Sequence, residues 1–155
     1  MEQPMKRTLI VYASIHHQNT YKVVGYLSTH LDADVVDATK SHECDCLGYD
    51  NVIFASGIYF SKLHRSVVDF INKADLSNKR VIIVYTCGVK IGDYTSRYRK
   101  ILKKKKAIYL GKATSRGLDT FGFFEKLHGI SKGHPNSKDL DRVLIKVTKL
   151  LDASR

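Results

Sequence analysis

The sequence is poor in cysteine and has no long apolar run, and these two shortages narrow the class of protein. Cysteine occurs only at positions 44, 46 and 87, and Cys44 and Cys46 are too close for an ordinary structural disulfide. A disulfide-stabilised scaffold is therefore excluded, and a reducing cytoplasm is the expected location. No stretch approaches the roughly 18–20 continuous apolar residues of a transmembrane segment. The first ten residues, MEQPMKRTLI, contain neither the apolar region nor the cleavage site of a signal peptide.

The strongest feature of the composition is an excess of positive charge. Lys and Arg number 26 against 15 Asp and Glu, which gives a net charge of +11. Such a charge favours acidic proteins, anionic membranes or nucleic acids as partners, but it does not indicate a fold. The 155 residues, 43% of them apolar, are enough for one domain with its own core. No repeat or linker interrupts the chain, so we expect a single domain over residues 1–155.

Apolar runs and helical spacings alternate along the chain. Runs rich in apolar and β-branched residues predict strands at 8–13, 34–38, 51–56, 80–86 and 107–114. Helical spacing predicts helices at 19–31, at 64–73, around 94–102 and at the end of the chain. Asn136 is expected to cap this last helix, with Asp139 three residues on. Strands that alternate with helices predict an α/β fold with a parallel sheet covered on both faces.

Three segments follow predicted strands at the sheet edge where open α/β proteins bind ligands. They are 14–20, 57–63 and 87–94. The first, SIHHQNT, offers hydroxyls, an amide and backbone N–H groups at a helix N-terminus, which suits a phosphate. It has neither the glycines of a Walker loop nor the pattern G-x-G-x-x-G. An ordinary helix cap at Asn19, with the histidines in solvent, explains the same residues.

The second segment belongs to the stretch SGIYFSKLHR, residues 56–65. Tyr59 and Phe60 follow a buried strand directly, which is unusual for a surface loop. Exposed aromatic side chains at a strand end form a flat apolar wall that suits a planar ring. The alternative is that these side chains fold onto the edge of the core, which we expect for one of the two.

The third segment belongs to the stretch TCGVKIGDY, residues 86–94. Gly88 and Gly92 permit a close approach of the backbone to a ligand, and Tyr94 offers another ring. A helix entrance capped by Asp93 is compatible with this interpretation and also explains the stretch without any ligand.

These stretches, followed by RGLDTFGFFEKLHGISKGHPNSKDL before the last helix, resemble in their order the flavodoxin family. The resemblance covers nearly the whole chain. It implies a flavodoxin-like three-layer αβα sandwich with a five-stranded parallel sheet in the order 2-1-3-4-5. It also implies FMN as the cofactor. The residues that would hold the FMN phosphate are Ser14, His16, His17, Gln18, Asn19 and Thr20. Those that would border the flavin ring are Ser56, Gly57, Ile58, Tyr59, Phe60, Ser61, Thr86, Cys87, Gly88, Val89 and Tyr94.

Three features depart from the familiar flavodoxin pattern. Gln18 stands where the phosphate loop Thr-Gly-Asn-Thr has glycine, so this residue is strained or the loop is reshaped if φ there is positive. Ser61 stands where relatives often have glycine, which would make a turn of that peptide costlier. Well-known flavodoxins are acidic, whereas this chain is basic. No insertion splits the strand AIYLGKAT, so the short-chain type is the closer match.

The resemblance implies an FMN-binding protein that transfers electrons between redox partners. An FMN-dependent oxidoreductase acting on a quinone, a porphyrinogen or NAD(P)H, similar to the menaquinone-dependent protoporphyrinogen oxidases, is the first alternative. A non-enzymatic binding module that uses the basic surface is the second, with YRKILKKKK (98–106) as its candidate. A nucleic-acid partner is not favoured, because no aromatic residues alternate with these lysines. A redox partner with an acidic surface, or peripheral contact with an anionic membrane, fits the charge better.

Other chemistry-bearing residues carry no catalytic or metal assignment. His42, Cys44 and Cys46 lie close together, but their spacing matches no usual zinc site. Cys87 is assigned to packing or flavin contact, because a cysteine after a buried strand often behaves as a small apolar residue. The long connection 115–135 either shapes a substrate pocket or is a surface excursion anchored by three phenylalanines, at 121, 123 and 124.

Overall fold

A computed structural model describes residues 5–15, 18–88, 92–117 and 133–153. Its strands are β1 (Thr8–Ala13), β2 (Asp34–Asp37), β3 (Asn51–Tyr59), β4 (Lys62–Leu63), β5 (Arg80–Cys87) and β6 (Ile108–Arg116). Its helices are α1 (Asn19–Leu31), α2 (Arg65–Lys73), α3 (Ser96–Lys104) and α5 (Ser137–Ala153). Within these described ranges, no helix is long and apolar enough to cross a bilayer.

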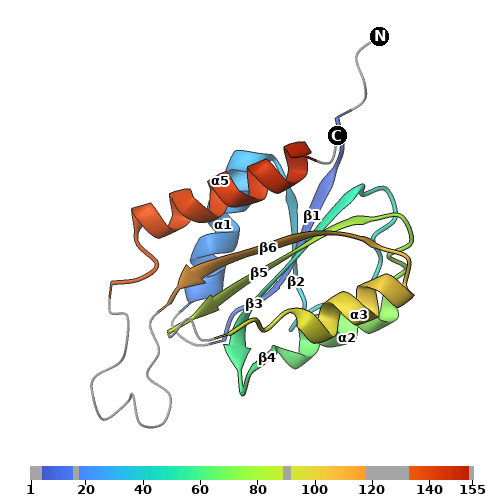
Figure 1. Ribbon diagram of the computed structural model, residues 1–155, viewed down its shortest axis with the longest axis horizontal. Coiled ribbons are helices and arrows are strands. Elements are labelled where there is room, and N and C mark those ends of the chain that lie inside the picture. Colours follow the sequence, from blue (N-terminus) through green and yellow to red (C-terminus); the bar gives the residue numbers. More distant parts are fainter. Residues whose placement is uncertain (1–4, 16–17, 89–91, 118–132, 154–155) are drawn as a thin grey trace.

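The strands form one parallel sheet in the order β2-β1-β3-β5-β6, and the short β4 pairs with β3 in the antiparallel sense. With β5 and β6 as the fourth and fifth parallel strands, this is the predicted order 2-1-3-4-5. Figure 1 shows α1 and α5 on one face of the sheet and α2 and α3 on the other. The predicted three-layer αβα sandwich is therefore confirmed.

Alternate residues of each central strand supply the two halves of the core. In β5, Val81 and Ile83 pack with the α2 and α3 side, whereas Ile82 and Val84 pack with the α1 and α5 side. All four side chains are fully buried. A strand with both faces covered must be apolar at every position, which is why these strands read as continuous apolar runs. Burial of each such side chain contributes roughly 1.5–3 kcal/mol to stability.

The N-terminus of α5 carries the cap that the sequence predicts. The Asp139 N–H donates to the Asn136 side-chain oxygen at 3.0 Å, and the Asn136 N–H donates to the Asp139 carboxylate at 2.9 Å. This reciprocal pair satisfies two backbone donors that a helix start leaves without intrahelical partners. The first helical residue, Ser137, is thereby set by the sequence itself.

Two strand ends differ from the prediction. β3 continues to Tyr59 and turns back into β4, so 57–63 is a short hairpin and not a loop. Phe60 and Ser61 have φ of 49° and 64°, the left-handed pattern of two-residue hairpin turns. The usual Asn-Gly or Asp-Gly signal is absent, so the sequence does not predict this turn. β6 runs to Arg116, two residues beyond the predicted end.

Candidate functional site

The three predicted segments meet at the carboxyl edge of the sheet. The hydroxyl oxygens of Thr20, in the first turn of α1, and Thr86, near the end of β5, are 3.0 Å apart and buried. Gly117, just after β6, donates its N–H to the Cys87 carbonyl at 3.2 Å. A Cβ on Gly117 would lie only 2.6 Å from the Asn19 side-chain nitrogen. The first segment, the third segment and the end of β6 are therefore in direct contact.

The first segment differs in one detail from the simple helix-cap interpretation. Gln18, not Asn19, is the residue before the helix, and its side chain makes no capping bond. Asn19 is the first helical residue and is only 9% exposed. The Ser14 hydroxyl accepts the Tyr21 N–H at 3.1 Å and so takes the role of the cap from outside the helix.

Gln18 has φ 54°, in the left-handed region. From the glycine at this position of the family's phosphate loop, we expect either a strained Gln18 or a reshaped loop. The structure shows the first: a glutamine with left-handed backbone. A non-glycine residue costs about 1–2 kcal/mol there. Predicted site residues His16, His17 and Val89 lie outside the described residues, as do the three phenylalanines of the long connection.

In the second stretch, some residues are buried and connect β3 to α2, whereas others are exposed at the hairpin tip. The Ser56 hydroxyl is fully buried, accepts the His64 N–H at 2.8 Å and donates to the Gly57 carbonyl, so it ties β3 to the start of α2. The Tyr59 ring folds back over Gly57 and lies edge-on to the His64 ring, with ring centroids 5.4 Å apart. Phe60 is 82% exposed at the tip of the hairpin, beside the exposed Ser61, whereas Ile58 packs partly into the core.

The third segment is held down by a carboxylate. Asp93 accepts the N–H and the hydroxyl of Thr95, and it pairs with Lys112 of β6 at 2.9 Å. These contacts hold the pKa of Asp93 well below its usual value, and the hydrogen bond from the Thr95 hydroxyl has the largest effect. The sequence predicts Asp93 as the cap of the next helix. In the structure the cap position of α3 is Thr95, and Asp93 lies two residues before it.

Aromatic packing completes this segment. Tyr94 lies edge-on to Tyr85, with ring centroids 5.6 Å apart, and burial raises the pKa of Tyr85 to about 12. Cys87 and Gly88 are half-buried, and Cys87 packs against the core on the α2 and α3 side. Of the two roles expected for Cys87, packing or flavin contact, the structure shows the packing, and the flavin contact stays a prediction.

The two cysteines near position 45 differ in burial. Cys46 is 2% exposed, and burial raises the pKa of its thiol to about 11. Cys44 is half-buried, and its sulfur lies near the backbone oxygen of His42. Across the part of the chain that the structure describes, no group of three or more His, Cys, Asp or Glu side chains is arranged to hold a metal ion.

A groove beside the hairpin was not foreseen from the sequence. It has a volume of about 710 Å³ and lies between the hairpin, α2 and α3. Its lining comprises Ile15, Tyr59, Phe60, Lys62, Leu63, His64, Arg65, Val68, Arg97, Tyr98 and Ile101. Burial lowers the pKa of His64, one of these lining residues. Arg97 lies 35 residues beyond Lys62 in the sequence, so only the fold brings these side chains to one groove.

Gly117 is a second position that sequence reasoning missed. It is buried against Asn19. The predicted strand ends at residue 114, which left Gly117 inside the long connection. A glycine two or three residues past a strand at the ligand edge of such a sheet was the available signal.

Comparisons with known proteins agree with this architecture. The family model described as "Flavodoxin domain" matches residues 9–125. An uncharacterized protein of Methanocaldococcus jannaschii is 35% identical over 138 residues, which cover 88% of this chain and 92% of that protein.

Solved structures show the same fold at low sequence identity. Flavodoxin of Fusobacterium nucleatum bound to flavin mononucleotide has a TM-score of 0.68 at 16% identity, with 96% of this chain and 99% of that one covered. A short-chain flavodoxin associated with a bacterial microcompartment has a TM-score of 0.67 at 16% identity, with 97% and 100% covered. An NADPH-quinone reductase from P. pentosaceus has a TM-score of 0.61 at 13% identity, with 92% and 96% covered. The matched domain spans most of the chain and includes all three strand-end segments in full, and this chain belongs to the flavodoxin domain family.

Proposed function

We propose that this protein binds FMN at the carboxyl edge of its sheet and transfers electrons between redox partners. The observation that carries the proposal is the convergence of the predicted segments there, joined by the buried contact of Thr20 with Thr86. Ligands of open α/β sheets bind at this edge. The likeness to a flavodoxin bound to flavin mononucleotide supports FMN as the ligand.

The residues at the start of α1 fit a phosphate. The first turn of this helix contains no acidic side chain, so no carboxylate there opposes an anion. Asn19 and Thr20 contribute an amide and a hydroxyl at the positive end of the helix dipole. Ser14, Gln18, Asn19 and Thr20 are the described residues that would hold the phosphate, with His16 and His17 as further proposed ligands.

The second and third segments fit a planar ring. Tyr59, Phe60 and Tyr94 supply aromatic surface, and the backbone of Gly88 permits a close approach. Gly57 lies beneath the Tyr59 ring and lets that ring pack close to β3. When bound, FMN would supply the redox chemistry, and the protein would tune it through charge, hydrogen bonds and exclusion of water. Thr86 and Cys87 would border the ring from β5. A reducing compartment such as the cytoplasm suits the three free cysteines.

An oxidoreductase is the second candidate function. The 710 Å³ groove borders Tyr59, so a small substrate could lie near the proposed flavin position. The likeness to an NADPH-quinone reductase supports this alternative. Steady turnover of a quinone, a porphyrinogen or NAD(P)H by the FMN-loaded protein separates an enzyme from a carrier.

The test is an FMN titration of the purified chain, followed by visible absorbance. We expect one FMN per chain. Thr20→Val should weaken binding at least tenfold, because it removes one hydroxyl of a buried pair and leaves Thr86 without this contact. Thr148→Val on α5 is the matched control and should bind FMN like the parent protein. A folded protein that ignores FMN, or equal binding by the two variants, would overturn the proposal.

A further inference from the structure

The groove between the β3–β4 hairpin, α2 and α3 combines an apolar floor with exposed apolar walls. Leu63 and Tyr98 are buried at its base, and Val68 and Ile101 are partly buried along it. Phe60 is 82% exposed and Ile15 is 44% exposed at its margin. Exposed apolar side chains gathered around one concave site are typical of a binding surface and not of an ordinary solvent-facing helix pair.

The rim of the groove is positively charged. Lys62, Arg65 and Arg97 line it, and the lining residues that the structure describes include no carboxylate. Arg65 pairs with Asp69 at 3.8 Å, but the two side chains are 92% and 50% exposed. Such exposed pairs contribute little and are readily exchanged for another anion.

The positive charge continues from the rim along α3. Lys100 and Lys104 follow Arg97 at helical spacing and are exposed. The groove is thus one end of a basic strip on the α2 and α3 side of the sheet. A partner with negative charge would be attracted over the whole strip and guided toward the apolar centre.

We propose that this groove docks an acidic protein segment, which inserts an apolar or aromatic side chain while its carboxylates pair with Lys62, Arg65 and Arg97. An apolar centre within a charged rim, rich in aromatic side chains and arginine, is the usual arrangement of a protein interface. The apolar side chains of Leu63, Val68 and Ile101 suit an inserted apolar side chain. A nucleic-acid groove would offer successive exposed rings for stacking, whereas among the rings that line this groove only Phe60 is exposed. The volume lies within the range of about 300–1,000 Å³ typical of ligand sites.

The geometry of the groove does not depend on the proposed function. The identity of the docked protein as a redox partner does rest on it. Tyr59 lines the groove and belongs to the second segment, so a docked partner would lie beside the proposed flavin position. A basic docking surface also explains why this chain carries a net charge of +11. The redox partner is therefore expected to present an acidic surface with a protruding apolar side chain.

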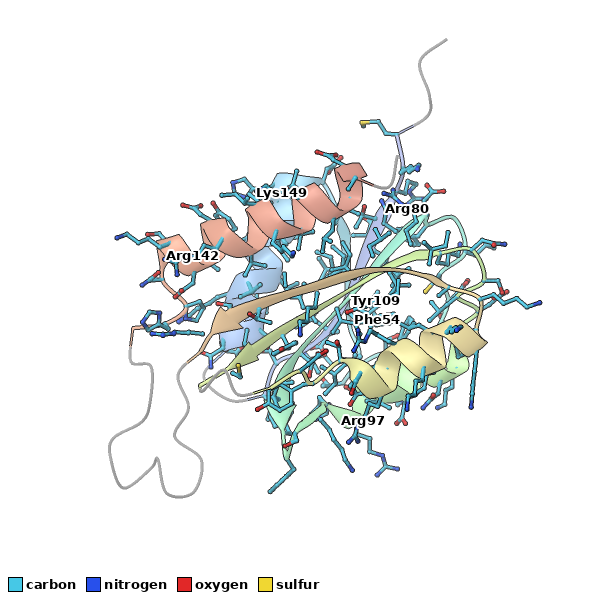
Figure 2. All side chains as sticks on the ribbon, in the orientation of Figure 1. Phe54, Arg80, Arg97, Tyr109, Arg142 and Lys149 are labelled. Carbon is cyan, nitrogen blue, oxygen red and sulfur yellow. The ribbon has the colours of Figure 1, made fainter. Side chains whose placement is uncertain are left out.

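The test uses a fluorescein-labelled pentapeptide, Asp-Glu-Phe-Glu-Asp, as the probe in fluorescence anisotropy. Lys62→Glu with Arg97→Glu should weaken its binding at least tenfold. The control is Lys146→Glu with Lys149→Glu on α5, which changes the net charge equally and should weaken binding less than threefold. Figure 2 shows Arg97 on the α3 side and Lys149 on the opposite side of the molecule. All four side chains belong to exposed residues, so the fold should be kept.

Two further measurements sharpen the result. The neutral variant Lys62→Gln with Arg97→Gln should give an intermediate loss, and a peptide with alanine in place of phenylalanine should bind several-fold more weakly. Equal binding by the α3-side and α5-side variants would overturn the proposal. So would dependence on Lys62 and Arg97 for a single-stranded oligonucleotide or for phosphatidylglycerol vesicles but not for the peptide.

FMN absorbance, read on the same samples, separates the two proposals. A Lys62→Glu, Arg97→Glu protein that keeps FMN and loses the peptide supports docking at the groove. A chain that fails to bind FMN but shows the same order of peptide affinities also supports docking, while it overturns the proposed function.

Discussion

The amino and carboxyl edges of the sheet use polar residues in opposite ways. At the amino edge, the first residues of three neighbouring strands, Thr8, Asn51 and Arg80, lie side by side in register and bond to one another. Arg80 also donates to the Leu151 carbonyl near the end of α5. All three residues are buried. The side chains of these three residues therefore bond to one another, and Arg80 connects the sheet to α5.

The carboxyl edge keeps apolar side chains exposed and the backbone strained. Phe60 and Ile15 are exposed there, and Gln18 and Ser61 have positive φ without being glycine or asparagine. At the amino edge, Asp32 and Lys106 have positive φ just after helices, where this conformation is usual, and Asn78 has it in the turn before β5. If the carboxyl edge binds FMN as proposed, the ligand would offset the strain at Gln18 and Ser61.

The largest expected effect comes from breaking the amino edge. Arg80→Met should lower the free energy of unfolding by about 2–4 kcal/mol, because it leaves the Asn51 oxygen and the end of α5 without a buried donor. Urea unfolding measures this change. Arg142→Met on α5, where the arginine side chain is 75% exposed, is the control and should cost less than about 0.5 kcal/mol. Equal costs would show that the Arg80 network adds nothing to stability.

A smaller effect is expected at the carboxyl edge, and it should appear in binding. Gly117→Ala places a methyl group 2.6 Å from the Asn19 side chain, so Asn19 must move. We expect about tenfold weaker FMN binding, which corresponds to about 1.4 kcal/mol, as measured by titration. Gly25→Ala, in the middle of α1 with open space around it, should leave FMN affinity unchanged and raise stability by about 0.8 kcal/mol. Unchanged affinity in Gly117→Ala would mean that Asn19 does not contribute to the site.

The smallest effect is expected from relieving the backbone strain at Ser61. Ser61→Gly should raise the free energy of unfolding by about 1 kcal/mol, because glycine adopts the φ of 64° without steric cost. Thermal or urea unfolding measures it. Lys62→Gly, at the next position, should instead lower stability by about 0.5–1 kcal/mol, because its backbone is extended and glycine gains nothing there. A loss of stability in both variants would show that the turn is not strained.

The fold was predictable because its signals are local. The continuous apolar run of β5, the reciprocal cap of Asn136 and Asp139, and the alternation of strands with helices all act within a few residues. The hairpin at Phe60 and Ser61 was missed because neither residue is typical of a tight turn. Gly117 was missed because its role depends on Asn19, which is 98 residues away in the sequence.

By itself, the sequence determined the order of elements, the two-faced burial of the strands and which segments follow the strands at the ligand edge. Those properties follow from side-chain period and backbone preference, which each short stretch carries alone. Only the tertiary structure decided that Thr20 meets Thr86, that Asn51 and Arg80 close the other edge, and that Lys62 and Arg97 share one groove. Contacts between residues so far apart depend on how the parallel strands are ordered in the sheet, and no local pattern records that arrangement.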